Sequence, residues 1–344
     1  MPRAKVPGDA SSAGQCRAMT AVQHRRLVAD PVASMYAGAA KSAIRPAKGR
    51  RQETISLKVM TYRWGGRRCV GVVSADGAEV EPLDLGERGA RRGALALIEA
   101  QAAGQTQRAA GPRLPRSAIT PEAPLPLPRR NIFCVGRNYR AHARELSGTI
   151  FAKDDKPIDQ WPIIFTKVPE CVIASSEAIR LPGAISAQID YEAELAVVIG
   201  RGGVNISRAR AMDHVWGYTI VNDVTARDVQ SRHHQWDLGK SFDTFCPMGP
   251  CLVSADELDG RDTRVRCWVN GDLRQDARTS DLIFDIPTLI ETCSRGITLF
   301  PGDVIATGTP AGVGMGMTPP TYLRRGDVVK IEIDGIGTLE NPVH

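Results

Sequence analysis

Apolar and polar residues alternate along much of the chain from residue 58 onward, a pattern typical of strands with one buried face. KVMTYRW (58–64) and RRCVGVVSADGAEVEPLDL (67–85) show it in part, with Asp76-Gly77 as a hairpin turn signal. GALALIEAQAAG (93–104) has no such alternation and predicts a short helix that ends at Gly104. The first part of the chain is therefore expected to be a small β-rich unit with one helix.

The same alternation returns after residue 130 and predicts a longer set of strands. Two tight turns, Asn270-Gly271 and Asp334-Gly335, each lie between alternating segments and predict hairpins. IPTLIETCSRG (286–296) predicts a helix with Asp285 as N-cap and Gly296 after its end. The expected strands are NIFCV (131–135), PIIFTK (162–167), YEAELAVVIG (191–200) and WGYTIVND (216–223).

Composition agrees with a globular, β-rich α+β protein, because 42% of residues are hydrophobic, 24% are charged, and Gly and Pro are plentiful. The Pro-rich stretch 112–130 is expected to be an extended linker. We therefore expect a small N-terminal domain with its linker at 59–125 and a larger domain at 126–344. No apolar run approaches the ~20 residues that a membrane span needs, so we expect no membrane segment.

Positive charge is concentrated at the N-terminus. Residues 1–58 hold 11 Lys and Arg against 3 Asp and Glu, although the whole chain carries only +6. The rest is therefore slightly acidic, and we expect no nucleic-acid partner. Residues 1–58 are predicted to be disordered or a targeting extension, and a true start at Met60 would give the same pattern. Eight cysteines without a CxxC pair indicate a reducing compartment, so we expect a cytoplasmic protein, with organelle import as the alternative.

Three acids in DYEAELAVVIG (190–200) raise the first chemical question. Asp190, Glu192 and Glu194 alternate, so their side chains point the same way on a strand. They form either a solvated strand face or part of a metal site, and for the two glutamates alone the solvated face is the more common arrangement. Asp223 ends a largely apolar strand, where a ligand is a better explanation than an idle charge. Three carboxylates suit Mg²⁺ or Mn²⁺, with Ca²⁺ as a further option, and Asp190 is placed outside the site.

Polar residues beside these acids are the next candidates, and each also has a structural explanation. Lys240 is either a solvated lysine or a cation that offsets the acids. Thr225 and Asp228 match a capping box, after which Gln230 faces the site or the solvent. The neighbouring His233 and His234 are expected to be loop residues rather than ligands.

A histidine–glutamate pair is the third candidate. His142 and Glu145 are three apart on a predicted helix and share a face, where the carboxylate can orient the imidazole as a general base. An incidental exposed pair is the alternative. Arg137 and Tyr139 follow shortly after the end of a predicted strand, a position where ligands often bind. GDVIATGTPAGVG (302–314) predicts a loop that offers backbone N–H groups and a Thr hydroxyl to an anion, or else a plain connection.

Six stretches together resemble the fumarylacetoacetate hydrolase family, whose fold is shared by acylpyruvate hydrolases, hydroxymuconate-type isomerases and oxaloacetate decarboxylases. The resemblance covers roughly residues 131–344 and is much weaker over 59–125. The matching stretches are VGRNYRAHARE, DYEAELAVVIG, GYTIVNDVTARDVQ, GKSFDTFCPMGP, VNGDLRQDARTSDLIFDIP and GDVIATGTPAGVG.

The resemblance implies a role for each candidate and a mixed β-roll with short helices, usually dimeric. It implies metal ligands at Glu192, Glu194 and Asp223, and a lysine beside the metal at Lys240. The remaining implied roles are a water-activating dyad at His142 and Glu145, on a segment (140–160) that orders over substrate, and substrate-oxygen contacts at Arg137, Tyr139, Gln230 and Thr309.

The resemblance favours a divalent-metal hydrolase that cleaves a C–C bond in a 2,4-dioxo acid through a metal-bound enolate. We expect Mg²⁺, a 2-oxo acid substrate and a homodimer. The alternatives are an isomerase of aromatic degradation acting on a 2-hydroxyhepta-2,4-diene-1,7-dioate-like compound, and an oxaloacetate decarboxylase. A non-catalytic module holding a structural Ca²⁺ is the alternative from another class.

Overall fold

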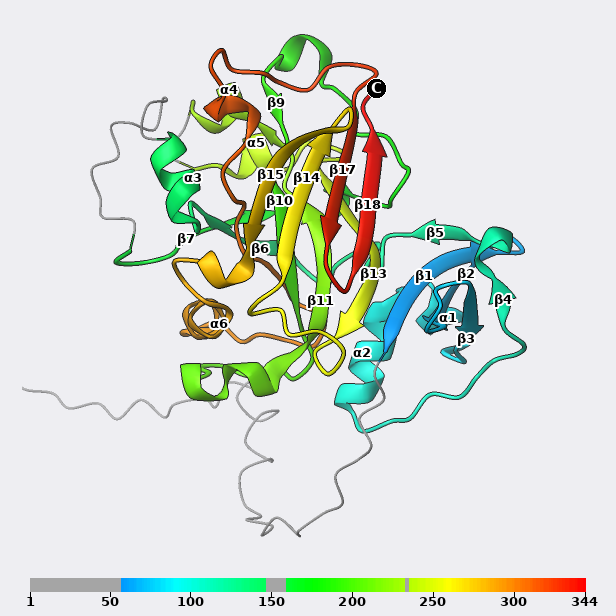
Figure 1. Cartoon of the computed structure of the whole chain (residues 1–344). Coiled ribbons are helices and arrows are strands. Elements are labelled where there is room, and N and C mark those ends of the chain that lie inside the picture. The colour runs from blue at the N-terminus through cyan, green and yellow to red at the C-terminus, as the bar shows by residue number, and fades with distance from the viewer. Residues whose placement is uncertain (1–56, 147–158, 233–234) are drawn as a thin grey trace, which may run out of the picture. The chain divides into compact units, whose positions relative to one another are not determined.

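Strands are the main regular element of the computed structural model, which describes residues 57–146, 159–232 and 235–344 (Figure 1). Three sheets lie within these residues, and the helices are short, so the expected β-rich α+β fold is confirmed. The longest sheet has twelve strands in the order β4-β3-β2-β1-β13-β11-β10-β16-β6-β7, with β5 on β1 and β8 on β13. Its strands are β1 (Lys58–Trp64), β2 (Arg67–Val73), β3 (Glu79–Pro82), β4 (Leu114–Pro115), β5 (Thr120–Glu122), β6 (Ile132–Gly136), β7 (Ile163–Lys167), β8 (Val172–Ile173), β10 (Ala193–Ile199), β11 (Val215–Asn222), β13 (Cys246–Ser254) and β16 (Val304–Ala306).

The second sheet contains the two hairpins predicted at Asn270-Gly271 and Asp334-Gly335, whereas the one predicted at Asp76-Gly77 joins β2 and β3 of the first sheet. Its order is β15-β14-β17-β18, formed by β14 (Arg264–Val269), β15 (Asp272–Arg278), β17 (Val328–Ile333) and β18 (Gly337–Pro342). Asn270 and Gly271 have φ angles of 53° and 86°, and two positive values in a row are what a type I′ turn requires. A third, two-stranded sheet pairs β9 (Ile189–Asp190) with β12 (Thr225–Ala226).

Helices lie between the strands, and the strongest predicted helix is confirmed. The Asp285 carboxylate accepts a hydrogen bond from the Thr288 N–H at 2.9 Å and caps α6, as expected. None of the helices in the described ranges is long and apolar enough to span a bilayer. The helices are α1 (Gly86–Ala90), α2 (Ala94–Ala102), α3 (Arg140–Glu145), α4 (Arg227–Gln230), α5 (Asp237–Lys240) and α6 (Ile286–Ser294), with 3₁₀ turns η2 (Arg116–Ala118), η4 (Pro169–Cys171), η5 (Gly183–Ile185), η6 (Arg208–His214), η7 (Thr279–Asp281) and η8 (Gly314–Gly316).

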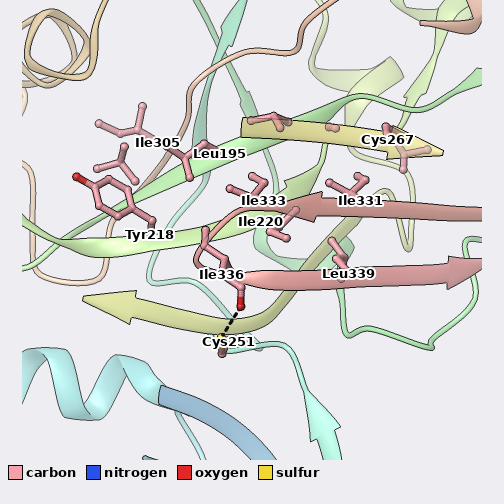
Figure 2. Close-up of a cluster of buried hydrophobic side chains, with 14 of the residues drawn as sticks. Leu195, Tyr218, Ile220, Cys251, Cys267, Ile305, Ile331, Ile333, Ile336 and Leu339 are labelled. Carbon is pink, nitrogen blue, oxygen red and sulfur yellow. Dashed lines mark hydrogen bonds between the residues drawn. The ribbon is translucent and has the colours of Figure 1, made fainter. Parts of the chain in front are cut away.

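Two hydrophobic clusters cover opposite faces of β10. Leu195 belongs to the cluster in Figure 2, where β10 and β11 face the side chains of β17 and β18. Ala196 and Val198 belong to the other cluster, together with Leu97 and Ile98 of α2. Every residue of β10 is buried, so the strand carries its polar side chains into the interior of the protein.

The Pro-rich segment 112–130, expected to be a linker, takes part in the sheet. Its residues form β4 and β5, which pair with β3 and β1. Leu125 is fully buried in the second cluster. Proline is tolerated here because these short strands lie at the margin of the sheet, where a missing N–H leaves no interior ladder bond unmade.

Candidate active site

The register of two antiparallel strands brings three carboxylates together. Ala193 of β10 pairs with Asn222 of β11, so Glu192 and Glu194 lie beside Asp223 at the end of β11. One oxygen from each of these acids lies within 4.8 Å of the other two. The exposed fractions of the three residues are 5%, 1% and 0%, so the interpretation as a solvated strand face is wrong.

Two buried lysines contact the acid cluster. Lys240 Nζ lies 2.8 Å from both Glu192 Oε2 and Asp223 Oδ2. Lys167, at the end of β7, places its Nζ 2.8 Å from Asp223 Oδ1 and 3.1 Å from the Val224 carbonyl oxygen, and also donates to the Lys240 carbonyl. Both are almost fully buried, and paired contact with carboxylates is the arrangement that makes such burial tolerable.

Arg227, the first residue of α4, completes the charged cluster from the other side. Its Nε lies 2.9 Å from Asp190 Oδ2, and one terminal nitrogen lies 2.7 Å from Glu192 Oε1. Asp190 in turn accepts hydrogen bonds from the Gly314 and Met315 N–H groups, which attaches it to η8. The other terminal nitrogen of Arg227 is buried and has no hydrogen-bond partner within the described residues.

The pKa values of Glu192 and Glu194 are shifted in opposite directions. Burial raises the pKa of Glu192, but Lys240 and Arg227 outweigh it and bring the pKa down to about 2. Burial and the negative charges of Asp223 and Glu192 raise the pKa of Glu194 well above its usual range. The charge of Lys240 and the N–H of Gly308, at 2.9 Å, favour the ionised form of Glu194, but they do not outweigh these effects. A cation among the three acids is what would favour it.

The donor set fits a hard divalent cation. Three buried carboxylates within reach of one another offer oxygen ligands only, the kind that Mg²⁺, Mn²⁺ and Ca²⁺ prefer. Three protein ligands also leave coordination positions for a substrate, whereas a structural Ca²⁺ site usually takes six to eight oxygens. Glu192, Glu194 and Asp223 are thus the residues that would hold the ion.

The histidine–glutamate pair lies in the wall of the same site. His142 Nδ1 is 3.0 Å from Glu145 Oε2, and His142 is only 3% exposed, so it is not an incidental surface pair. The other oxygen of Glu145 accepts the Gly312 N–H at 2.9 Å. A side-chain carbon at Gly316 would lie 2.3 Å from the Glu145 carboxyl group, so only glycine leaves room for it. The Glu145 carboxylate is therefore held from two sides.

A narrow pocket joins the dyad to the acid cluster. It is lined in part by His142, Glu192, Glu194 and Lys240, and its volume of ≈ 20 Å³ holds about one water molecule. A 2-oxo acid can therefore bind only if the pocket walls separate. Residues 147–158 of the segment that we expected to close over substrate lie outside the described residues.

Three of the four expected substrate contacts line this pocket, namely Arg137, Gln230 and Thr309. Tyr139 is not among the lining residues: its side chain is buried, its backbone pairs with Leu282, and burial and the charge of Glu194 raise the pKa of its hydroxyl. The Thr309 hydroxyl donates to the Ala193 carbonyl at 3.1 Å and accepts from the Gln275 amide. These bonds hold Thr309 in place at the wall.

Sequence reasoning missed Arg227 and Lys167 and misassigned a neighbouring pair. Thr225 and Asp228 do not form the expected capping box: Thr225 donates to the Asp223 carbonyl, and Asp228 accepts from Ser186. The residue that caps α4 is Ala226, without a side-chain bond. Two signals were available in the sequence. Arg227 is a cation two residues after the threonine of the expected capping box, and Lys167 is the last residue of a largely apolar predicted strand. His233 and His234 lie outside the described residues.

Replacing Lys167 by Met should destabilise the metal-free protein. Removing one partner of a buried ion pair leaves the other charge uncompensated, which costs about 3–5 kcal/mol. We expect the free energy of unfolding to fall by about 3 kcal/mol in urea titrations, because Asp223 keeps Lys240 as a partner. Lys330→Met is the matched control, since the Lys330 side chain is 40% exposed. Equal losses in both variants would contradict the assigned role of Lys167.

Comparison with known proteins gives one family model and two similar relatives, each of which matches about two thirds of the chain. The family model described as fumarylacetoacetate (FAA) hydrolase C-terminal matches residues 131–344. Oxaloacetate tautomerase YisK of Bacillus subtilis is 50% identical over 228 residues, which cover 66% of this chain and 74% of that protein. The mitochondrial oxaloacetate tautomerase fahd2 of Xenopus laevis is 46% identical over 67% of this chain and 70% of its own.

Solved structures resemble a larger part of the chain. A fumarylacetoacetate hydrolase from Exiguobacterium antarcticum matches with a TM-score of 0.72 and 39% identity, over 84% of this chain and 99% of that one. A 2-hydroxyhepta-2,4-diene-1,7-dioate isomerase from Mycobacterium marinum matches with a TM-score of 0.67 and 33% identity, over 84% and 98%. Both matches extend into the strands that precede residue 131, because each covers more of the chain than the family model does.

Proposed function

The chain belongs to the fumarylacetoacetate hydrolase family, and from that premise we propose that it is a divalent-metal-dependent keto–enol tautomerase of a short 2-oxo dicarboxylate such as oxaloacetate. The family and its enzymatic character follow from the matches, and the reaction is our inference. It is supported by two tautomerases at 50% and 46% identity. We propose Mg²⁺ or Mn²⁺ as the metal.

The observation that carries the proposal is the unpartnered donor of Arg227 in the pocket wall. One terminal nitrogen of this buried guanidinium has no hydrogen-bond partner among the described residues, while its other nitrogens contact Asp190 and Glu192. A buried, unpaired donor is costly, and a substrate carboxylate would satisfy it. Gln230 and Arg137 line the pocket nearby and are the proposed further contacts to that group.

The bound metal would supply Lewis acidity toward the 2-oxo group and the neighbouring carboxylate. Lys240 complements it: Glu192 and Asp223 engage two of the three N–H groups of its ammonium, and the third is left for an oxygen that becomes negative. Both acids thereby fix the position of that donor.

His142 is the proposed general base that transfers the proton. A neutral imidazole that donates from Nδ1 to Glu145 has its lone pair at Nε2, which can take a proton from the carbon next to the 2-oxo group. The protonated ring, stabilised by the Glu145 carboxylate, then returns the proton to the oxygen or to the carbon. A substrate that fills this small pocket leaves little room for water beside the ring, which favours return of the proton over its loss to solvent.

Hydrolysis of a C–C bond in a 2,4-dioxo acid is the second candidate. The same oriented imidazole can take a proton from water instead of from carbon, and a solved relative is named as a fumarylacetoacetate hydrolase. The two reactions differ in their need for an attacking water next to the distal carbonyl. Oxaloacetate decarboxylation and double-bond isomerisation need no such water and share the remaining steps.

The test compares four reactions of the metal-loaded full chain. The ultraviolet absorbance of enol-oxaloacetate follows tautomerisation, and coupled assays follow pyruvate release from oxaloacetate, acetylpyruvate and fumarylpyruvate. We expect tautomerisation to have the highest kcat/KM and to disappear with a chelator. We also expect 2-oxobutyrate, which lacks the second carboxylate, to enolise about 10–100-fold less efficiently, since it leaves Arg227 unpaired. Faster hydrolysis than tautomerisation, or full activity in excess chelator, would contradict the proposal.

A further inference from the structure

A second, much larger cavity lies in the N-terminal strands. Its volume is ≈ 590 Å³, within the range of small-molecule sites, and its walls come from β1, β2, α1 and the chain around Leu83 and Leu114. None of its lining residues lines the pocket at the acid cluster. Nothing in the proposed tautomerase chemistry uses this cavity.

One of the residues that line this cavity carries an unsatisfied hydroxyl. Tyr62 on β1 is fully buried and lines the cavity, and its hydroxyl has no hydrogen-bond partner in the described part of the chain. Burial raises the pKa of Tyr62 to about 12, so the group is a neutral donor at physiological pH. A buried hydroxyl without a partner costs stability, and a ligand oxygen would recover it.

The cavity is also positively charged. Four arginines line it, Arg63, Arg67, Arg68 and Arg91, against two acids, Asp84 and Glu87. Glu122 engages Arg63 and Arg68, and Glu87 engages Arg91 at 2.7 Å. Arg67 makes no ion pair or side-chain hydrogen bond within the described residues, so its guanidinium is available to a ligand anion.

The strand register places this arginine with an aromatic side chain and the tyrosine. Trp64 of β1 pairs with Arg67 of β2, and Tyr62 pairs with Cys69, so these four side chains share one face of the hairpin. Trp64 is 49% exposed, and Leu83 and Leu114 add apolar surface to the walls. The combination offers an apolar surface for the body of a ligand and two donors for its charged end.

We propose that this cavity is a second ligand site, which binds a small organic carboxylate with an aromatic or apolar body. Arg67 and the Tyr62 hydroxyl hold the carboxylate, and Trp64 with the leucines covers the body. Charge favours this occupant over the chain's own N-terminal segment, because residues 1–56 are strongly basic and the cavity is as well. The proposal does not depend on the reaction assigned to the acid cluster.

The probe is 1-naphthoate, titrated calorimetrically into the full chain with Mg²⁺ and saturating oxalate, so that the acid cluster is occupied. We expect saturable binding of one naphthoate per chain. The uncharged 1-naphthamide should bind at least about tenfold more weakly, since it cannot form charge-assisted hydrogen bonds.

Two variants and one control decide the outcome. Tyr62→Phe should weaken naphthoate binding about five- to tenfold without lowering the midpoint of thermal unfolding, because it removes only an unpaired hydroxyl. Arg67→Ala should weaken binding about tenfold or more. Arg210→Ala, an exposed arginine paired with Asp213 on η6, should leave binding unchanged. No saturable binding, or equal affinity in all four proteins, would overturn the proposal.

Discussion

Replacing Glu194 by Gln should lower kcat/KM about a thousandfold and reduce divalent-metal affinity below detection by calorimetry. The amide keeps the size of the side chain and its contact with Gly308, but removes one of three carboxylate ligands. Without the bound metal, a developing oxyanion loses several kcal/mol of transition-state stabilisation. A thousandfold loss of kcat/KM corresponds to about 4 kcal/mol. Glu257→Gln, on an exposed segment, is the control and should behave like the unchanged chain.

The same substitution should stabilise the metal-free protein, which separates loss of a ligand from loss of the fold. The pKa of Glu194 is raised in the folded chain by burial and by Asp223 and Glu192, so its ionisation opposes folding. That penalty is absent below the ordinary carboxyl pKa of 4.5, grows as pH rises from that value toward the folded pKa, and is complete above the folded pKa. Urea unfolding with chelator should show the variant to be more stable than the parent at pH 8 and equal to it near pH 4. A variant less stable at pH 8 would contradict this electrostatic account.

Replacing His142 by Ala should reduce tautomerisation 10²–10⁴-fold while metal affinity stays within about threefold of the parent. General-base catalysis is typically worth this factor, and His142 is not among the proposed metal ligands. The measurements are kcat/KM by the enol assay and metal binding by calorimetry. An equal loss of metal affinity would show that His142 supports the acid cluster rather than moving a proton.

Glu145→Gln should be almost as damaging, for a reason specific to this structure. One oxygen of Glu145 accepts the Gly312 N–H, and the other faces His142 Nδ1. The amide oxygen would keep the Gly312 bond, so the amide NH₂ would face the ring and make Nδ1 an acceptor. The proton would then sit on Nε2, where the lone pair is needed. Activity in this variant close to that of the parent would show that the orientation of the ring, and not its tautomer, is what Glu145 supplies.

Local patterns in the sequence predicted the elements of this fold well. Alternation identified β1, β2 and the hairpins at Asn270-Gly271 and Asp334-Gly335, because period-two burial and turn chemistry are local properties. The capping of α6 by Asp285 was predictable for the same reason. Spacing alone left Glu192 and Glu194 between two interpretations, and the resemblance to a family favoured the metal site; the structure buries both side chains.

The charged surroundings of the acids were not predictable from local patterns. Lys167 reaches Asp223 only because β7 and β11 converge with α5, and these segments are far apart in the chain. Arg227 was not predicted as a site residue, because it lies between Thr225 and Asp228, which match a capping box. In the structure Thr225 instead donates to the Asp223 carbonyl. The backbone pairing of Tyr139 with Leu282 joins segments far apart in the chain, and no local signal indicates it.

The pairing of β1 with β13 has a consequence for synthesis on the ribosome. Leu57 and Ser254 exchange hydrogen bonds across 197 residues of sequence, next to the pairing of Val59 with Leu252. At about 5–20 residues per second, β1 emerges roughly 10–40 s before its partner. During that interval β5 can cover the edge of β1 at residues 61–63, but Lys58 and Val59 at the start of the strand stay without their partner and leave a short open edge that other nascent chains can extend. Efficient production of this protein should therefore depend on chaperones that shield this edge until β13 emerges.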